Sequence, residues 1–247
     1  MREAGTDIAV ESRGLKVSAR RAAVEFAVGY ALILAVIWTP RPLQRWLWVL
    51  AAVGIAVLIW RSFPGWRAMG FTAANFVRSL WIVGVALALA AAAIAIAAHL
   101  HTLHLPPGGP MAFIGTYIAY AIWTGVQQFL LQGFFLPRLE RINFRFRAGA
   151  SRAWVAALGA ALLFAAAHLP NPILTPATFL LGFASCLLFQ RYRNIYPLMI
   201  AHAILGITVA ICVPGPVVHN MRVGLGYLRY SPPMHRHGHR FAPSAQP

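Results

Sequence analysis

The chain has 247 residues, of which 60% are hydrophobic and only 11% carry a charge. This composition is too apolar for a surface that faces water, which excludes an ordinary soluble domain and makes lipid the solvent for much of the chain. Lysine and arginine number 21 against 5 acidic residues, for a net charge of +16. The basic residues lie between the apolar runs, so we read the charge as membrane topology and expect no nucleic-acid partner.

The chain begins with a basic segment, 1–21, followed by an apolar run that has no small-residue cleavage site and therefore predicts an uncleaved first span. Further apolar runs approach the roughly 20 residues that a helix needs to cross the hydrocarbon core. The sequence thus predicts an all-α, polytopic transmembrane helical bundle over 22–213. It has about seven spans, at 22–39, 46–60, 79–98, 111–136, 153–168, 174–190 and 195–213. The second span is short and has an alternative interpretation as the partner of the first span in a helical hairpin.

Basic loops predict the orientation. With a cytoplasmic N-terminus, the outer connections 99–110 and 169–173 contain no lysine or arginine, as the positive-inside rule expects. Nearly all basic residues are arginines and alanine is abundant, which is typical of a GC-rich bacterial genome and predicts the cell (inner) membrane. With seven spans, the outer side would hold Arg41, Arg45 and the basic tail, against the positive-inside rule. An eighth span near 217–228 would return the tail to the inside. The sequence therefore leaves open whether the number of spans is odd or even.

The remaining features are a tail and several candidate metal ligands. The tail, 214–247, is polar and proline-rich beyond Tyr230, which predicts that it is largely disordered. Cys186 and Cys212 lie in apolar runs and indicate no disulfide framework. The two histidine groups, 99–104 and 235–239, lack the closed ligand set of a structural site, so we predict no metal and no cofactor.

Polar residues inside the predicted spans are costly and indicate a functional site. Gln128 and Gln132 are four residues apart and share a helix face, with Gln127 about 100° to one side. His168 ends the fifth span and His202 lies on the seventh. Taken one at a time, these residues also fit a structural interpretation, in which the amides simply join neighbouring helices.

Three stretches resemble the motifs of one family. They read GVQQFLLQGFFLPRLER at 125–141, LLFAAAHLPNP at 162–172 and IYPLMIAHAILGI at 195–207. In order and spacing they are similar to the CAAX-protease and bacteriocin-processing family of intramembrane endopeptidases. The resemblance covers about 120–210 and places the family-like core at about 111–213.

This chain departs from the family pattern at several motif positions. The family's glutamate pair is replaced by Gln127 and Gln128, its arginine by Gln132 and its final asparagine by Gly206, whereas Phe164, His168 and His202 remain. The resemblance implies that the catalytic positions are Gln127, Gln128, His168 and His202. It also implies that Gln132, Phe164 and Gly206 line the cavity.

A glutamine cannot replace the glutamate as a general base, because its amide accepts no proton at any relevant pH. Two hypotheses therefore stay open. The chain is either an intramembrane endopeptidase homologue or a catalytically inactive membrane binding protein, a pseudoprotease. Both predict membrane lipids and a hydrophobic or prenylated peptide as partners. A small-solute transporter is a weaker alternative, since no paired charges or inverted repeat are visible.

Overall fold

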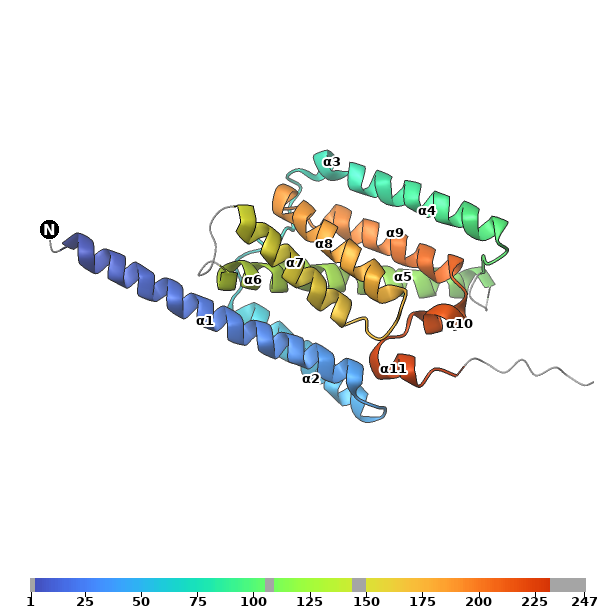
Figure 1. Cartoon of the computed structure of the whole chain (residues 1–247), viewed down its shortest axis with the longest axis horizontal. Helices are drawn as coiled ribbons and strands as arrows, with labels where there is room; N and C mark the ends of the chain where they lie inside the picture. The colour runs from blue at the N-terminus through green and yellow to red at the C-terminus, as the bar shows by residue number, and fades with distance from the viewer. Residues whose placement is uncertain (1–2, 105–108, 144–149, 232–247) are drawn as a thin grey trace, which may run out of the picture.

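The computed structural model describes residues 3–104, 109–143 and 150–231, and every regular element within these ranges is helical (Figure 1), which confirms the all-α fold. The elements in chain order are α1 Glu3–Trp38, α2 Leu43–Arg61, α3 Phe76–Ser79, α4 Trp81–His99, α5 Gly109–Gln128, the π-helix η1 Phe129–Phe135, α6 Leu136–Asn143, α7 Ala150–Ala166, α8 Leu174–Tyr192, α9 Tyr196–Cys212, α10 Gly215–Val218, the 3-10 helix η2 His219–Met221 and α11 Gly224–Leu228.

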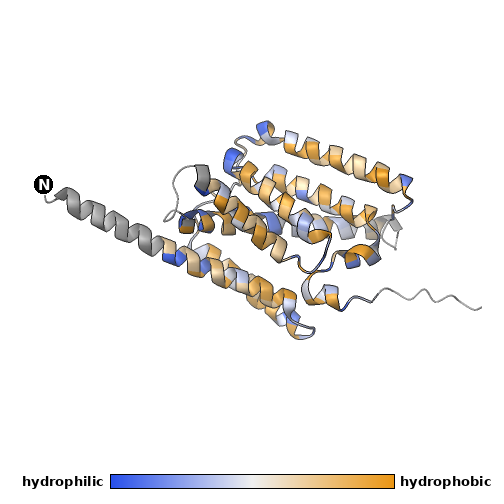
Figure 2. Ribbon diagram, in the orientation of Figure 1, coloured by the Kyte–Doolittle hydropathy of each residue, from blue (hydrophilic) through white to orange (hydrophobic). Residues whose placement is uncertain are grey.

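Three stretches are long and apolar enough to cross a membrane: Ala19–Trp38 within α1, Leu43–Arg61, and Phe76–His99. Arg152–Ala166 and Tyr196–Cys212 are shorter apolar helices. Hydrophobic residues run along the length of these helices, and hydrophilic residues gather at their ends (Figure 2). The region considered as an eighth span holds only α10, η2 and α11, each of which is far too short to cross the hydrocarbon core.

The first two predicted spans form a helical hairpin, because α1 packs along α2. The second span is longer than the sequence suggested and has 19 residues, Leu43–Arg61. It begins after Pro42, whose fixed backbone and missing N–H suit the start of a helix. It ends in Arg61, a basic residue that complements the carboxyl end of the helix dipole.

The core lies where α7 packs on α8 and where α4 and α5 pack on α9. Small side chains allow this close approach: Ala156, Ala157 and Ala160 on α7 have no exposed surface. Phe164 and Phe189 fill the space between the helices as part of the same buried cluster. The packing brings the motif-bearing stretches 125–141, 162–172 and 195–207 together.

The fourth predicted span, 111–136, is part of a longer run of helix. Helix α5 continues through η1 into α6, so the backbone stays helical as far as Asn143. A drop in hydropathy after Leu136 marks the end of the apolar stretch but not the end of the helix. This run carries two buried polar clusters, one at Gln128 and Gln132 and the other at Arg138.

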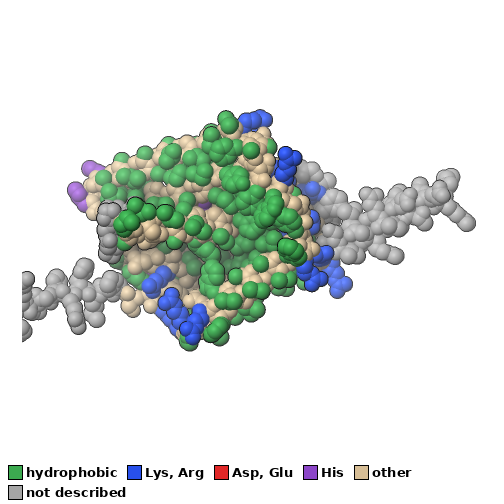
Figure 3. Space-filling view, turned by 180° about the vertical axis from the view of Figure 1, so that it is seen from behind, with side chains coloured by type: hydrophobic (Ala, Val, Ile, Leu, Met, Phe, Trp, Pro, Cys, Tyr) green, Lys and Arg blue, Asp and Glu red, His purple; other side chains and the backbone are tan. Residues whose placement is uncertain are grey.

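Basic residues from distant parts of the chain meet at one end of the bundle. Arg21 donates a hydrogen bond to the carbonyl of Arg61, and Arg138 donates one to Ser62. At the opposite end, the Gly224 N–H donates to the Leu169 carbonyl at 2.7 Å. Figure 3 shows the molecule from behind, with arginines at the two ends and a hydrophobic band between them.

The first part of the tail is folded. Helix α11 packs against α1 at the end of the bundle where Gly224 bonds Leu169. The disorder predicted beyond Tyr230 concerns 232–247, which lie outside the described residues. The second histidine group, 235–239, lies there too.

Candidate functional site

Four buried side chains from four elements form what we term the neutral cluster: Gln128 on α5, Gln132 on η1, Ser185 on α8 and His202 on α9. The Gln128 amide nitrogen lies 3.2 Å from Nδ1 of His202 on α9. The Gln132 amide donates to Oγ of Ser185 on α8 at 2.9 Å. Both glutamines have no exposed surface, and His202 is 4% exposed. The cluster therefore joins the helical run 109–143 to α8 and α9 through groups that carry no formal negative charge.

A change in helix type explains why the two glutamines bond different helices. The π-helix η1 begins directly after Gln128 and includes Gln132. Its wider turn rotates the side chains that follow relative to an α-helix, so residues four apart no longer point in quite the same direction. The sequence prediction that both amides lie in one interior agrees with their burial. It did not anticipate Ser185 on α8 as a partner.

Two hydrogen-bond acceptors of the neutral cluster lack a donor among the described residues. The amide oxygens of Gln128 and Gln132 are buried and have no hydrogen-bond partner among the described residues. A buried polar atom without a partner costs about 1–3 kcal/mol, and such atoms are rare in folded proteins. Two unpaired acceptors in one cluster indicate a place where a donor from a ligand or a water molecule would bind.

The Phe164 ring contacts both histidines of the site. Its ring centroid is 4.9 Å from that of His168 and 5.8 Å from that of His202, with the second pair perpendicular. Nδ1 of His168 lies 2.7 Å from the Phe164 carbonyl oxygen. Since a carbonyl can only accept, Nδ1 carries a proton, and in the neutral imidazole Nε2 of His168 is then the acceptor nitrogen. The family-like pair Phe164 and His168 therefore fixes one imidazole tautomer beside the neutral cluster.

Gly206 lies under the side chain of Tyr120. A Cβ atom at position 206 would overlap the Tyr120 hydroxyl and approach two of its ring carbons at 2.8 Å. The absence of a side chain at Gly206 thus allows a phenol hydroxyl from α5 to reach this part of α9. The sequence interpretation named Gly206 but missed Tyr120.

A spacing signal could have found these residues. Tyr120, Thr124 and Gln128 are four residues apart, which aligns them on one face of α5. Thr124 has no exposed surface and donates to the Ala121 carbonyl at 2.9 Å. The polar face of the helix therefore starts two turns before the glutamines.

Gln127 differs from its neighbour. It is half-buried, and its side chain makes no hydrogen bond with any residue that the structure describes. His168 is also half-buried. These two residues keep exposed surface at the edge of the site, whereas Gln128, Gln132 and His202 lie inside.

A second cluster, which we term the charged cluster, comprises Glu25, Arg21, Arg138 and Ser62. Arg138 binds the Glu25 carboxylate through Nη2 at 2.7 Å and Nε at 3.1 Å. Its Nη1 donates to the Phe134 carbonyl at 2.8 Å, and Arg21 binds the other carboxylate oxygen at 2.8 Å. Glu25, the one acid inside an apolar span, is thus a partner of Arg138 rather than a member of the neutral cluster.

No carboxylate is available to the neutral cluster among the described side chains. Glu25 is held by two arginines, and Glu140 accepts a hydrogen bond from Gln190 at 2.9 Å. The sequence has no acid between 26 and 139 and none after 140. Within the described residues no three histidine, cysteine or acidic side chains gather as metal ligands. The arrangement can donate and accept hydrogen bonds, but glutamate-based activation of water is not open to it.

The fold and site define a class of protein: a helical membrane protein with a buried polar site between its helices. The comparison with protein families then gives a specific match. Residues 117–208 match the family model described as Type II CAAX prenyl endopeptidase Rce1-like. This match confirms the resemblance found in the motifs. It covers less than half of the chain and includes Tyr120, the neutral cluster, Phe164, His168 and Gly206.

The family is one of integral membrane proteins, which agrees with the apolar helices of this chain. Neither the comparison with curated proteins nor the comparison with solved structures gave a match.

Proposed function

We propose that this protein binds a membrane-associated peptide, with a hydrophobic or prenylated end, at the neutral cluster and does not hydrolyse it efficiently. The observation that carries the proposal is the buried Gln128 amide, bonded to His202 where the family resemblance places a catalytic glutamate. An amide at this position can hold a ligand but cannot take a proton from water.

The unpaired oxygens of Gln128 and Gln132 support a binding role. A peptide backbone supplies N–H donors, and pairing a buried acceptor that lacks a partner stabilises the complex relative to the empty site. Gln127 and His168 keep exposed surface and form the edge at which the peptide enters.

The family match supports the choice of ligand. Its description names a prenyl endopeptidase, so a peptide that carries a prenyl group is the natural first candidate for a ligand. Neutral glutamines are also cheaper to bury in a membrane protein than glutamates, which suits a site that only binds.

Slow cleavage is the second candidate function. It is favoured by one observation, the Phe164, His168 and His202 arrangement, in which Nε2 of His168 is an acceptor. This imidazole would serve as an unconventional base. Without a carboxylate to stabilise the imidazolium, the rate would fall by orders of magnitude, about the 10²–10⁴-fold that a well-placed acid–base group supplies.

The test uses purified protein in neutral detergent and fluorescent membrane-tail peptides, with and without a farnesyl group. Binding is measured by anisotropy, and the mass of the recovered peptide shows whether it was cut. We expect the prenylated peptide to bind and to be recovered intact. A cleavage product that disappears in His168→Ala would overturn the binding-only proposal in favour of the second candidate.

A further inference from the structure

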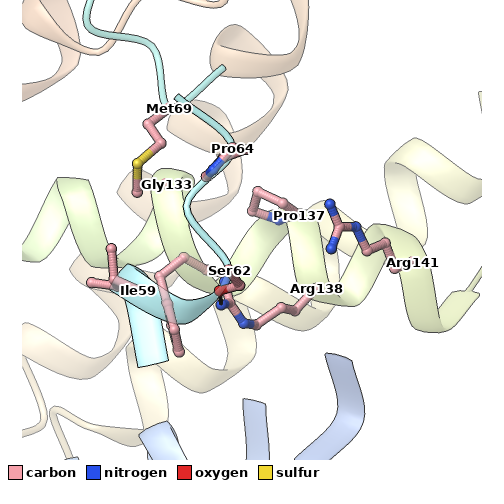
Figure 4. Close-up of a pocket in the computed structure, with 9 residues that line it drawn as sticks. Ile59, Ser62, Pro64, Met69, Gly133, Pro137, Arg138 and Arg141 are labelled. Atoms are coloured by element: carbon pink, nitrogen blue, oxygen red, sulfur yellow. Dashed lines mark hydrogen bonds between the residues drawn. The ribbon is translucent and has the colours of Figure 1, made fainter. Parts of the chain in front are cut away.

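A small pocket lies at the basic end of the bundle, and none of its lining residues belongs to the neutral cluster. Its volume is about 20 Å³, and it opens between the end of α2, the loop that follows and the helical run η1–α6 (Figure 4). This space holds one or two oxygen-sized atoms. The lining combines apolar walls with two guanidinium groups and a hydroxyl: Ile59, Ser62, Pro64, Met69, Gly133, Phe134, Pro137, Arg138 and Arg141.

Arg138 forms the inner wall of the pocket, and nearly all of its N–H donors already have hydrogen-bond partners. A guanidinium has five N–H donors. Nε binds Glu25, Nη2 binds Glu25 and Ser62, and Nη1 binds the Phe134 carbonyl. One N–H on Nη1 is left without a partner among the described residues. The guanidinium is also held in place, since it stacks over the Phe134 ring at 3.6 Å.

Arg141 forms the outer wall and is exposed. It has no ion pair with any acidic side chain that the structure describes, and it lies close enough to Arg138 for the two positive charges to repel each other. The single carboxylate of the charged cluster is shared by Arg21 and Arg138, so one positive charge remains there before Arg141 is added. The charged cluster therefore keeps one excess positive charge beside the pocket, and Arg141 adds a second at the outer wall.

The position of the pocket matches the headgroup level of a membrane. It lies at the end of α2, where Trp60 is 84% exposed and Trp66, in the following loop, is 62% exposed. Exposed tryptophans are typical of the membrane–water interface. Leu50, Val53 and Val57 on α2 are also exposed, so an apolar surface leads along this helix towards the pocket.

We propose that this pocket binds the phosphate of an anionic phospholipid headgroup, with the acyl chains lying along the exposed face of α2. The free N–H of Arg138 and the fork of Arg141 donate to the phosphate oxygens, a geometry that guanidinium groups suit well. Basic pockets beside membrane helices are known binding places for anionic headgroups. The site is independent of the peptide site.

The test measures lipid binding by native mass spectrometry of the full chain in neutral detergent, with phosphatidylglycerol, phosphatidylcholine and inorganic phosphate as probes. We expect the protein to retain phosphatidylglycerol in preference to phosphatidylcholine. Arg141→Gln should weaken phosphatidylglycerol binding about fivefold, the effect of one interfacial charge of about 1 kcal/mol. Peptide binding should stay unchanged.

The matched control is Arg191→Gln, which removes an exposed arginine from the end of α8 that lies beside α6 but does not line the pocket. An equal loss in both variants would show a general attraction to charge and overturn the proposal. Inorganic phosphate that binds as tightly as phosphatidylglycerol, and is lost equally in Arg141→Gln, would also overturn the proposal. That result would assign the pocket to a soluble anion.

Discussion

The charged and neutral clusters lie on one continuous helical run but satisfy their polar groups in opposite ways. In the charged cluster, Glu25 and Arg138 are joined by short bonds and nearly every donor and acceptor is used. In the neutral cluster, Gln128 and Gln132 each bond once and leave a buried oxygen unpaired. The difference indicates that the first cluster holds α1 on the family-like core. In the proposed function, the unpaired oxygens of the second cluster are the acceptors for a ligand.

The largest expected effect comes from breaking the charged cluster. Glu25→Leu leaves Arg138 as a buried cation without a counter-ion, and breaking a buried ion pair in this way costs about 3–5 kcal/mol. The measurement is the free energy of unfolding in detergent. Arg21→Ala is the control: its side chain is 55% exposed, so its loss should cost less than about 1 kcal/mol. Equal costs for the two changes would contradict a structural role for the buried pair.

A smaller loss is expected where Tyr120 meets Gly206. Gly206→Ala pushes a methyl group into the phenol, and overpacking of this kind costs about 1–3 kcal/mol. Tyr120→Leu removes the hydroxyl and should relieve part of the clash, so the double variant should be more stable than the sum of the single changes predicts, by about 0.5 kcal/mol or more. Strict additivity in this double-mutant cycle would show that the two residues are not in contact.

The smallest effect on stability is expected in the neutral cluster. Gln128→Leu removes an unpaired acceptor as well as one hydrogen bond, so the free energy of unfolding should change by less than about 1 kcal/mol. The affinity for a prenylated peptide should fall about tenfold, which corresponds to about 1.4 kcal/mol. Anisotropy and thermal unfolding on the same sample check both effects. A large loss of stability with unchanged affinity would reverse the roles that we assign to the two clusters.

The sequence predicted most of the fold because lipid exposure leaves a strong hydropathy signal. The predicted spans 174–190 and 195–213 differ by no more than two residues at either end from α8 Leu174–Tyr192 and α9 Tyr196–Cys212. The extension of the fourth span to Asn143 was missed because hydropathy detects only apolar helix. The last turns of this run are held on α1 by the ion pair of Arg138 with Glu25. The pairing of Glu25 with Arg138 spans 113 residues and has no local pattern that would reveal it.

The candidate site was predicted in part. Motif spacing brought Gln128, His202 and Phe164 into one interpretation, and the structure places them together. Gln127 was assigned to the site by the family resemblance. The sequence already placed it about 100° to one side of Gln128, and its side chain is only half-buried. Ser185 was missed because a serine in an apolar helix has no distinctive spacing, and the π-helix that directs Gln132 towards it was not predicted.

The most direct test of the account is the rate at which the purified protein cleaves a prenylated peptide, measured for the wild type and for Gln127→Glu/Gln128→Glu. If Gln128 occupies the position of a catalytic base, the wild type should leave the peptide intact and the double variant should release a product. Cleavage by the wild type at a rate equal to that of the double variant would contradict the claim that the neutral cluster only binds.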